Sequence, residues 1–167
     1  SAEGFDYLQY WGQMTDGIDQ CCGNFYWPAP ALGGAEGFRR GIEDVHAQGG
    51  KVTGYMNCQT WTHDAFESEL LRLTPRAGLP TEALSLLHGL DWFEKWRLSR
   101  IDGSAQPYRN WHIMCPASEG FREHLAFWMV DMYARRFGAD GVYLDQAGAT
   151  LAKPCYNLGH GHDDIGA

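Results

Sequence analysis

The stretch that decides the fold is ADGVYLDQ, residues 139–146. A short apolar run follows a turn with glycine and ends in a carboxylate, which is typical of a buried parallel strand that presents a side chain at its C-terminal end. Because strand side chains alternate between faces, Val142 and Leu144 share one face, whereas Tyr143 and Asp145 share the other. Such strand ends carry the chemistry of (β/α) barrels, so Asp145 is the first candidate catalytic residue. An aspartate here also commonly caps the following turn, and that alternative stays open.

Three earlier segments have the same strand character, and helical patterns separate them. We predict strands at residues 5–11, 51–58 and 111–115, before the one at 139–146. A helix with an apolar stripe precedes Gly49-Gly50, and another begins at Ser118-Glu119 and ends at Gly138. This alternation predicts a parallel sheet with helical crossovers.

Two segments interrupt the alternation. Residues 12–34 form a long loop, of the kind that tends to be functional in a compact domain. Between the second and third strands we predict helices at 64–73 and 81–90, followed by a hairpin at Asp102-Gly103. This helix-plus-hairpin excursion contributes no strand to the predicted parallel sheet.

The predicted fold class is α/β, a partial (β/α)8 TIM barrel of about four βα units. A complete barrel needs about 250 residues, so the 167 residues are expected to form one domain, the N-terminal half of such a barrel. The first and last strands of half a barrel expose their edges. We therefore expect a homo-oligomer in which a second copy covers them.

Composition excludes several classes of partner. The formal net charge is −8 and lysine and arginine do not cluster, so we expect no nucleic acid partner. Apolar stretches stay shorter than the roughly 20 residues that cross a bilayer, so we expect no membrane partner. The five cysteines include no C-x-x-C pair and cannot all pair within one chain, which argues against a disulfide framework. The cellular compartment stays open.

Three segments, residues 49–57, 114–118 and 140–146, resemble the second, third and fourth barrel strands of α-galactosidase-like and α-glucosidase-like retaining glycoside hydrolases. The chain is also similar to a group of uncharacterised bacterial glycosidase-like proteins. Those proteins carry a cysteine and a His-Gly-His shortly after the fourth strand, here Cys155 and His160-Gly161-His162. The similarity extends from about Tyr7 to His162.

The resemblance implies a carbohydrate substrate and makes Asp145, at the end of the fourth strand, the nucleophile. A retaining glycosidase needs a second carboxyl group about 5 to 5.5 Å away as acid/base. In the family this group comes from a later strand, so the chain is expected to be a fragment that is inactive alone. We do not assign the role to the loop or cap residues Asp16, Asp64, Asp163 and Asp164.

Further residues are candidates for binding the sugar. Trp11 and Trp61 follow predicted strands and can stack on a sugar face, although aromatic residues also simply pack. Asn57 and Gln146 can hydrogen-bond hydroxyl groups or serve turns. His160 and His162 are assigned to sugar contacts.

The H-x-H spacing of these two histidines also occurs in zinc sites, which leaves a metal-dependent hydrolase as an alternative function. We predict no further cysteine or histidine cluster that completes four ligands, and we assign no metal and no cofactor. A non-catalytic sugar-binding module is the other alternative.

Overall fold

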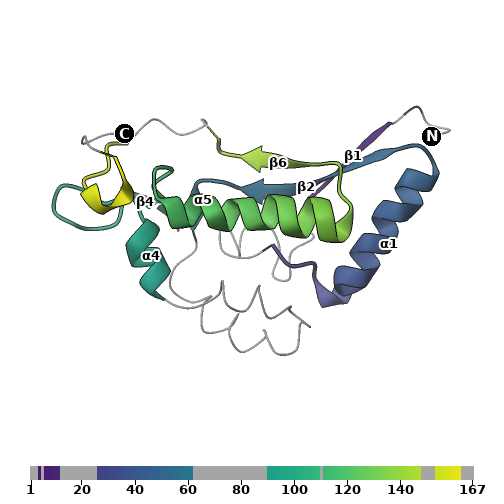
Figure 1. The fold of residues 1–167 in the computed structure, drawn as a ribbon, viewed down its shortest axis with the longest axis horizontal. Helices are drawn as coiled ribbons and strands as arrows, with labels where there is room; N and C mark the ends of the chain where they lie inside the picture. Colours follow the sequence, from purple (N-terminus) through teal and green to yellow (C-terminus); the bar gives the residue numbers. More distant parts are fainter. Residues whose placement is uncertain are drawn as a thin grey trace.

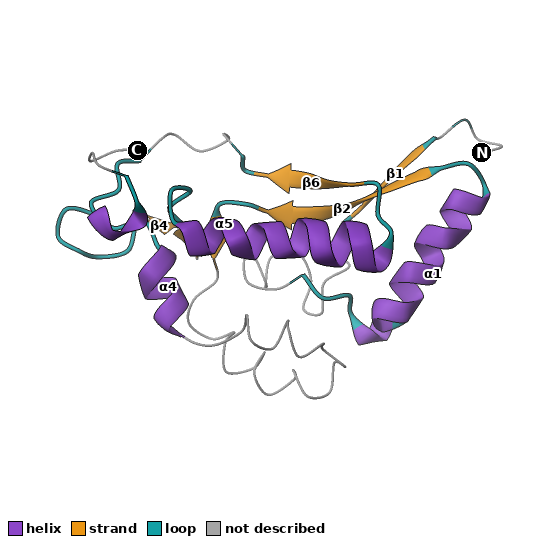
Figure 2. Ribbon diagram, viewed as in Figure 1, coloured by secondary structure: helices purple, strands orange, loops and turns teal. Residues whose placement is uncertain are grey.

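A parallel sheet of three strands forms the centre of the fold (Figures 1 and 2). The computed structural model describes residues 4, 6–11, 26–61, 90–109, 111–147 and 153–162. The strands are β1 (Tyr7–Tyr10), β2 (Lys51–Asn57) and β6 (Gly141–Asp145), in the order β1-β2-β6. Asn57 pairs with Asp145, so β2 and β6 end level with each other. The strands predicted at residues 5–11, 51–58 and 139–146 are confirmed as β1, β2 and β6.

The helices that follow β1 and precede β6 lie on one face of this sheet (Figure 1). A short turn, η1 (Pro30–Leu32), leads into α1 (Gly34–Ala47). The second helix begins as α5 (Glu119–Ala126) and continues with wider π-type turns as η3 (Phe127–Phe137). Gly138 ends it with a left-handed φ of 82°, as predicted from the sequence.

The main core lies between this helical layer and the sheet. A Cβ added to Gly54 of β2 would lie 2.0 Å from Tyr133 Cε1 of η3, so the strand and the helix approach closely only because residue 54 is glycine. The core cluster consists of Tyr26, Trp27, Ile42, Val52, Met56, Trp128, Met132, Tyr133, Phe137 and Ala139, and the buried Tyr55 joins it from the opposite face of β2. The described end of the predicted long loop, residues 26–33, therefore contributes to packing.

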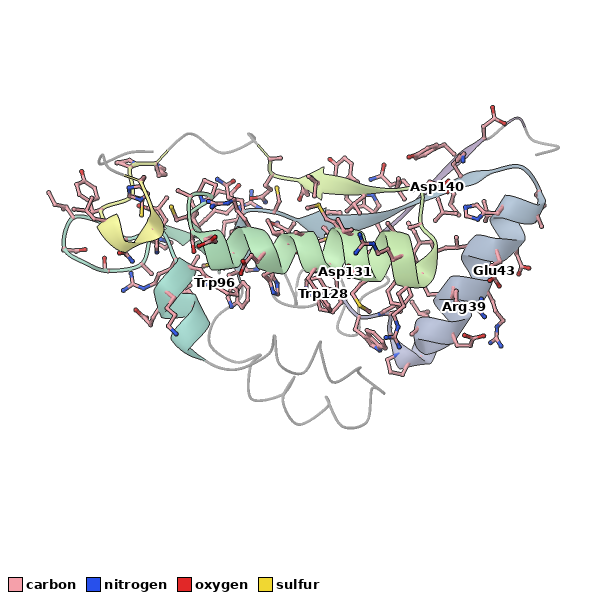
Figure 3. All side chains as sticks on the ribbon, in the orientation of Figure 1. Arg39, Glu43, Trp96, Trp128, Asp131 and Asp140 are labelled. Atoms are coloured by element: carbon pink, nitrogen blue, oxygen red, sulfur yellow. The ribbon has the colours of Figure 1, made fainter. Side chains whose placement is uncertain are left out.

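A hydrogen-bond network at Asp140 fixes the start of β6 (Figure 3). Its carboxylate accepts hydrogen bonds from Val52 N at 2.9 Å, Lys51 Nζ at 2.9 Å and His46 Nε2 at 2.7 Å. Burial by itself raises the pKa of Asp140, but these donors outweigh it and hold the pKa well below its ordinary value. The network joins the C-terminal end of α1 to the N-terminal ends of β2 and β6.

A smaller antiparallel sheet lies beside the C-terminal end of β2. Its strands are β3 (Thr60–Trp61), β5 (Trp111–Ile113) and β4 (Pro107–Tyr108), in the order β3-β5-β4. The helix α4 (Leu90–Trp96) lies between β3 and β4 in the chain, and Ser99 pairs with Ala105 across the turn at Asp102-Gly103. The hairpin predicted at Asp-Gly is confirmed.

The third parallel strand predicted at 111–115 is wrong. Residues 111–113 form the middle strand of the antiparallel sheet, because β4 ends only three residues before β5 begins and pairs with it locally. Pro116 then stops the segment, since proline lacks the N–H that a strand ladder needs. As a result β2 pairs directly with β6, and Asp145 ends the third parallel strand of the described sheet.

Several predicted features lie outside the described residues. They are the helices at 64–73 and 81–89, most of the loop at 12–34, and the four carboxylates at 16, 64, 163 and 164. None of the described helices is long and apolar enough to cross a membrane.

The C-terminal segment returns to the small sheet (Figure 1). Tyr156 N donates a hydrogen bond of 2.9 Å to Ser99 O, and the turn η4 (Leu158–His160) follows. Cys155 packs in a minor core with Leu98, Ile113 and Cys115. The tail therefore lies against the hairpin and β5.

Candidate functional site

The face of the parallel sheet opposite the helices carries a group of aromatic residues beside a carboxylate. We call Trp11, Tyr55, Tyr143 and Asp145 the strand-end site. Strand alternation sends Tyr55, Tyr143 and Asp145 to this face, whereas Val142 packs against the main core. The prediction that Tyr143 and Asp145 share one face is consistent with this arrangement.

The Asp145 carboxylate has a defined orientation. Tyr55 Oη donates a hydrogen bond of 2.8 Å to Asp145 Oδ2. The backbone carbonyl of Asp145 accepts from Cys58 N at 3.2 Å and from Cys58 Sγ at 3.1 Å, which ties the ends of β2 and β6 together. Burial, with the charge of Asp145, raises the pKa of the Cys58 thiol. Asp145 thus keeps one carboxylate oxygen beside a hydroxyl donor at the C-terminal end of a parallel strand.

Trp11 lies close to the Asp145 carboxylate, and its side chain is exposed to solvent. Its ring centroid is 5.0 Å from that of Tyr55 and 5.3 Å from that of Tyr143, and 52% of its surface is exposed. Tyr55 and Tyr143 stack on each other at 6.1 Å. The structure therefore places an accessible aromatic surface beside Asp145.

The two predicted amide ligands differ in their environment. Asn57 is 1% exposed, and its Oδ1 accepts from Gln59 N at 3.0 Å and Thr60 N at 2.9 Å, so it serves the turn after β2. Gln146 has a left-handed φ of 64°, and among the described residues its buried Oε1 has no hydrogen-bond partner. Backbone strain of this kind is often found at ligand sites.

Trp61, a candidate sugar contact from the sequence, does not lie beside Trp11 and is buried. It is 4% exposed and packs against Trp96 at 5.8 Å and His124 at 5.3 Å. Its ring lies in a second core with Phe93, Met114 and Phe121. The two tryptophans differ because β3 joins the antiparallel sheet, where its side chains are covered by α4 and α5.

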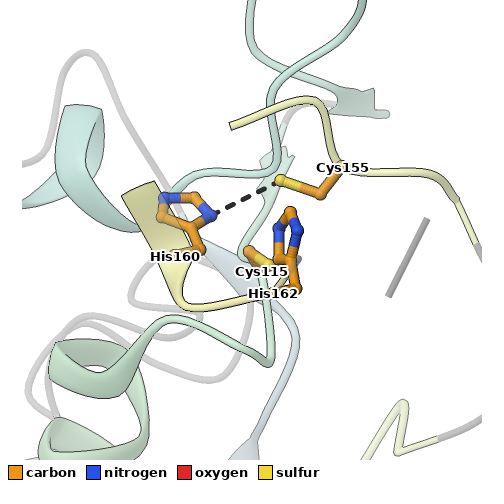
Figure 4. A group of neighbouring side chains, drawn as sticks. All are labelled: Cys115, Cys155, His160 and His162. Carbon is orange, nitrogen blue, oxygen red and sulfur yellow. Dashed lines mark hydrogen bonds between the residues drawn. The ribbon is translucent and has the colours of Figure 1, made fainter. Parts of the chain in front are cut away.

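A second group of functional side chains lies where the tail meets β5 (Figure 4). We call Cys115, Cys155, His160 and His162 the Cys/His cluster. All are buried, and one potential ligand atom from each lies within 4.8 Å of all the others. His160 and His162, which the sequence analysis assigned to sugar contacts, are only 5% and 7% exposed, and their rings face the cysteine sulfurs.

The expectation that nothing completes a four-ligand set around His160 and His162 is also wrong. Cys155 lies five residues before His160, so the C-x4-H-x-H pattern already contained three potential ligands in eight residues. The fourth, Cys115, comes from 40 residues earlier and is brought in by the β5 pairing. Only the tertiary structure reveals it.

Burial and neighbours affect the titration of the cluster. Burial raises the pKa of Cys115 to about 11, with a further contribution from Cys155, while the backbone N–H groups of Ala117 and Ser118 oppose the shift. Burial also lowers the pKa of His160, against the effect of its hydrogen bond to the Lys95 carbonyl. Cys115 and His160 are therefore uncharged at neutral pH.

Comparison with known families gives one match. The model of a family described as a domain of unknown function, DUF6259, matches residues 90–167. This segment includes Asp145 and the whole Cys/His cluster, but the description of the family names no activity. A search of curated proteins found no match to the chain.

Proposed function

We propose that the chain is part of a retaining glycoside hydrolase with a (β/α) barrel, and that Asp145 is the nucleophile. The observation that carries the proposal is the position of Asp145, at the C-terminal end of a parallel strand and hydrogen-bonded to Tyr55 Oη at 2.8 Å. In barrels of this class the side chains at that end surround the substrate. The face with Asp145 would be the barrel interior, because the helices lie on the other face.

The aromatic surface supports a carbohydrate as substrate. Trp11 and Tyr143 are 52% and 39% exposed next to Asp145, and sugar rings have flat apolar faces that stack on such rings. Polar groups near these rings are expected to bind hydroxyl groups. The unpartnered Oε1 of Gln146, which directly follows the nucleophile, is one such acceptor among the described residues.

The chemistry assigned to Asp145 is attack on the anomeric carbon. One carboxylate oxygen forms a bond to that carbon while the bond to the leaving oxygen breaks, and water later hydrolyses the glycosyl-enzyme. Tyr55 orients the carboxylate for this attack. The mechanism requires a second carboxyl group about 5 to 5.5 Å away, and we place it on a later strand of the same barrel.

The alternative of a metal-dependent hydrolase has less support. A catalytic zinc site keeps one coordination position open for water or substrate, whereas the Cys/His cluster offers four buried protein donors. A sugar-binding module without catalysis would explain the aromatic residues and leave Asp145 without a role. Trapping of a covalent intermediate, described at the end of the Discussion, distinguishes this alternative from a hydrolase.

Sugar binding is tested by the indole N–H signals of the tryptophans in an NMR titration with a panel of mono- and disaccharides. We expect the signal of Trp11 to shift with at least one sugar, whereas that of the buried Trp61 serves as an internal control and stays in place. Trp11→Ala should remove the binding. A Trp11 signal that no sugar of either anomeric series moves would contradict the proposal. Since the titration reads binding, it does not depend on the second carboxyl group.

A further inference from the structure

We propose that Cys115, Cys155, His160 and His162 bind one zinc ion in a closed, structural site. Two cysteine and two histidine ligands form one of the common sets for structural zinc. The four side chains come from two separate parts of the chain, the end of β5 and the tail, and they face a common point (Figure 4). Their surroundings are apolar, because Leu98 and Ile113 pack against both cysteines.

The separations between the donor atoms suit a tetrahedral ion. Zinc lies about 2.3 Å from sulfur and about 2.0 Å from nitrogen, so ligand atoms around it are about 3.4 to 3.8 Å apart. Cys155 Sγ and His160 Nδ1 already lie 3.4 Å apart, and all four donors lie within 4.8 Å of one another. Contraction by at most about 1.4 Å between any two donors closes the site, which side-chain rotations can supply.

The hydrogen bonds of His160 select the tautomer that a metal needs. His160 Nε2 lies 2.5 Å from the carbonyl oxygen of Lys95, which can only accept, so Nε2 carries the proton. Asn157 Nδ2 is farther from the same nitrogen, at 3.0 Å, and its Oδ1 is used by Gly159 N. Nδ1 therefore keeps its lone pair and faces Cys155 Sγ. Metal-binding histidines typically donate their second N–H to a carbonyl in this way.

His162 supplies an independent observation. Its ring is 93% buried, given a relative exposure of 7%, and neither of its nitrogen atoms has a hydrogen-bond partner among the described residues. A buried polar group without a partner costs about 1 to 3 kcal/mol. Its ring centroid lies 6.0 Å from that of His160, at the same side of the cluster. A metal ion bound by the other three donors would supply a partner for one of the two His162 nitrogen atoms.

Local backbone geometry also favours the site. Gly161, between the two histidines, has a left-handed φ of 79°, which turns both rings toward the cysteines. Ser118 N donates a hydrogen bond of 3.1 Å to the Cys115 carbonyl oxygen, which fixes the backbone at this ligand. On binding, zinc replaces the thiol protons, and these protons pass to solvent.

The role of the ion would be to hold the tail against the small sheet. Three ligands lie in residues 155–162 and the fourth follows β5, so the ion cross-links two segments that are 40 residues apart in the sequence. Linking such segments in the folded state stabilises the protein, and binding energy in a structural site is folding energy.

Metal analysis tests the proposal directly. The protein is expressed without a polyhistidine tag, purified in metal-free buffer, and analysed by mass spectrometry of its elements. We expect about one zinc per chain. Cys115→Ser and His162→Ala should each reduce it to below about 0.2 per chain, while His162→Cys, which keeps a ligand, should retain zinc. The matched control is Cys58→Ser, because Cys58 lies at the strand-end site and outside the cluster.

Cobalt substitution gives a readout that does not depend on the variants. Cobalt(II) in the wild-type protein should show the intense visible bands of tetrahedral coordination and thiolate charge-transfer absorption, and zinc should displace it. Three results would overturn the proposal: wild-type protein with less than about 0.2 zinc per chain and a six-coordinate cobalt spectrum, zinc content unchanged in Cys115→Ser and His162→Ala, or a Cys115–Cys155 disulfide in freshly purified protein.

Discussion

Gly54 lies where the sheet and the long helix approach each other closely. Tyr133 is fully buried, and a methyl group at residue 54 would lie 2.0 Å from its Cε1 and 2.5 Å from its Cδ1. We predict that Gly54→Ala lowers the free energy of unfolding by about 1 to 3 kcal/mol or more, because the packed ring must move. Denaturation in urea measures the change.

The matched control for this substitution is Gly41→Ala. A Cβ at Gly41 would have nothing within 4 Å, and Gly41 lies inside α1. Alanine there should raise the stability by up to about 1 kcal/mol, since it is the better helix former. Equal changes in the free energy of unfolding for the two substitutions would show that the contact with Tyr133 does not restrict the side chain at residue 54.

Asp140 provides a pH-dependent contribution at the same scale. Because its pKa is lowered in the folded protein, its stabilisation is complete above the ordinary carboxyl value of about 3.9 and is lost as the pH falls below it. We predict that Asp140→Asn lowers the free energy of unfolding by about 2 kcal/mol at pH 7. The difference from wild type should shrink below about pH 4.

The control for Asp140 is Asp131→Asn on the exposed face of η3 (Figure 3). Asp131 pairs with its helical neighbour Arg135, and its side chain is 47% exposed, so the change should be under about 0.5 kcal/mol. Urea midpoints across a pH series measure both variants. A loss for Asp140→Asn that stays constant down to pH 2 would contradict the role of its ionised carboxylate.

At the residue scale, the sequence predicted which face of the strand carries Asp145. It could not predict that Trp11 is exposed and Trp61 is buried. Period-two alternation is local, so it correctly groups Tyr143 with Asp145. Both tryptophans follow a predicted strand, but burial depends on which elements cover them. Trp61 is enclosed by Trp96 of α4 and His124 of α5, which lie 35 and 63 residues later in the sequence.

At the element scale, long and strongly patterned segments were predicted well and short ones were not. The helix runs from Glu119 to Phe137, with Ser118 as its N-cap and Gly138 as its C-cap, as its apolar stripe and these two boundary residues indicate. By contrast, β5 has three residues, too few for a pattern to distinguish parallel from antiparallel pairing. Its pairing with β4 follows from a tight local connection.

The tail is the element whose stability should depend on the metal. We predict that a chelator increases hydrogen exchange at residues 153–162 and 111–115, because these segments contribute the ligands of the proposed zinc site. Amides of β2 (Lys51–Asn57) serve as the internal control and should keep their protection. Hydrogen exchange at these residues that is the same with and without chelator would contradict a metal ion that links the tail to the small sheet.

At the scale of the whole molecule, the sheet has two outer strands, β1 and β6, within the part of the chain that is described. The side chains of β1 are exposed, with Tyr7 at 57%. Natural proteins usually cover edges of this kind. In the proposed barrel further strands would cover them, and in the 167-residue chain a second copy would.

We therefore predict that the 167-residue chain is a homo-oligomer in solution, with a mass that multi-angle light scattering measures as a multiple of 18.8 kDa. Tyr7→Lys should shift it toward the monomer, because charge on an edge strand disfavours pairing. Ile101→Lys, at the exposed tip of the hairpin, is the control and should leave the mass unchanged. A monomeric wild-type chain would contradict this prediction.

The central claim is that Asp145 forms a covalent bond with a sugar. Fluorinated glycosyl fluorides trap such an intermediate, and their leaving group departs without help from an acid, so the measurement does not depend on the second carboxyl group. After incubation with both anomeric series, peptide mass spectrometry should find the sugar on Asp145, with no adduct in Asp145→Asn and a normal adduct in Asp131→Asn. An adduct on another residue, or none with any reagent, would contradict the claim.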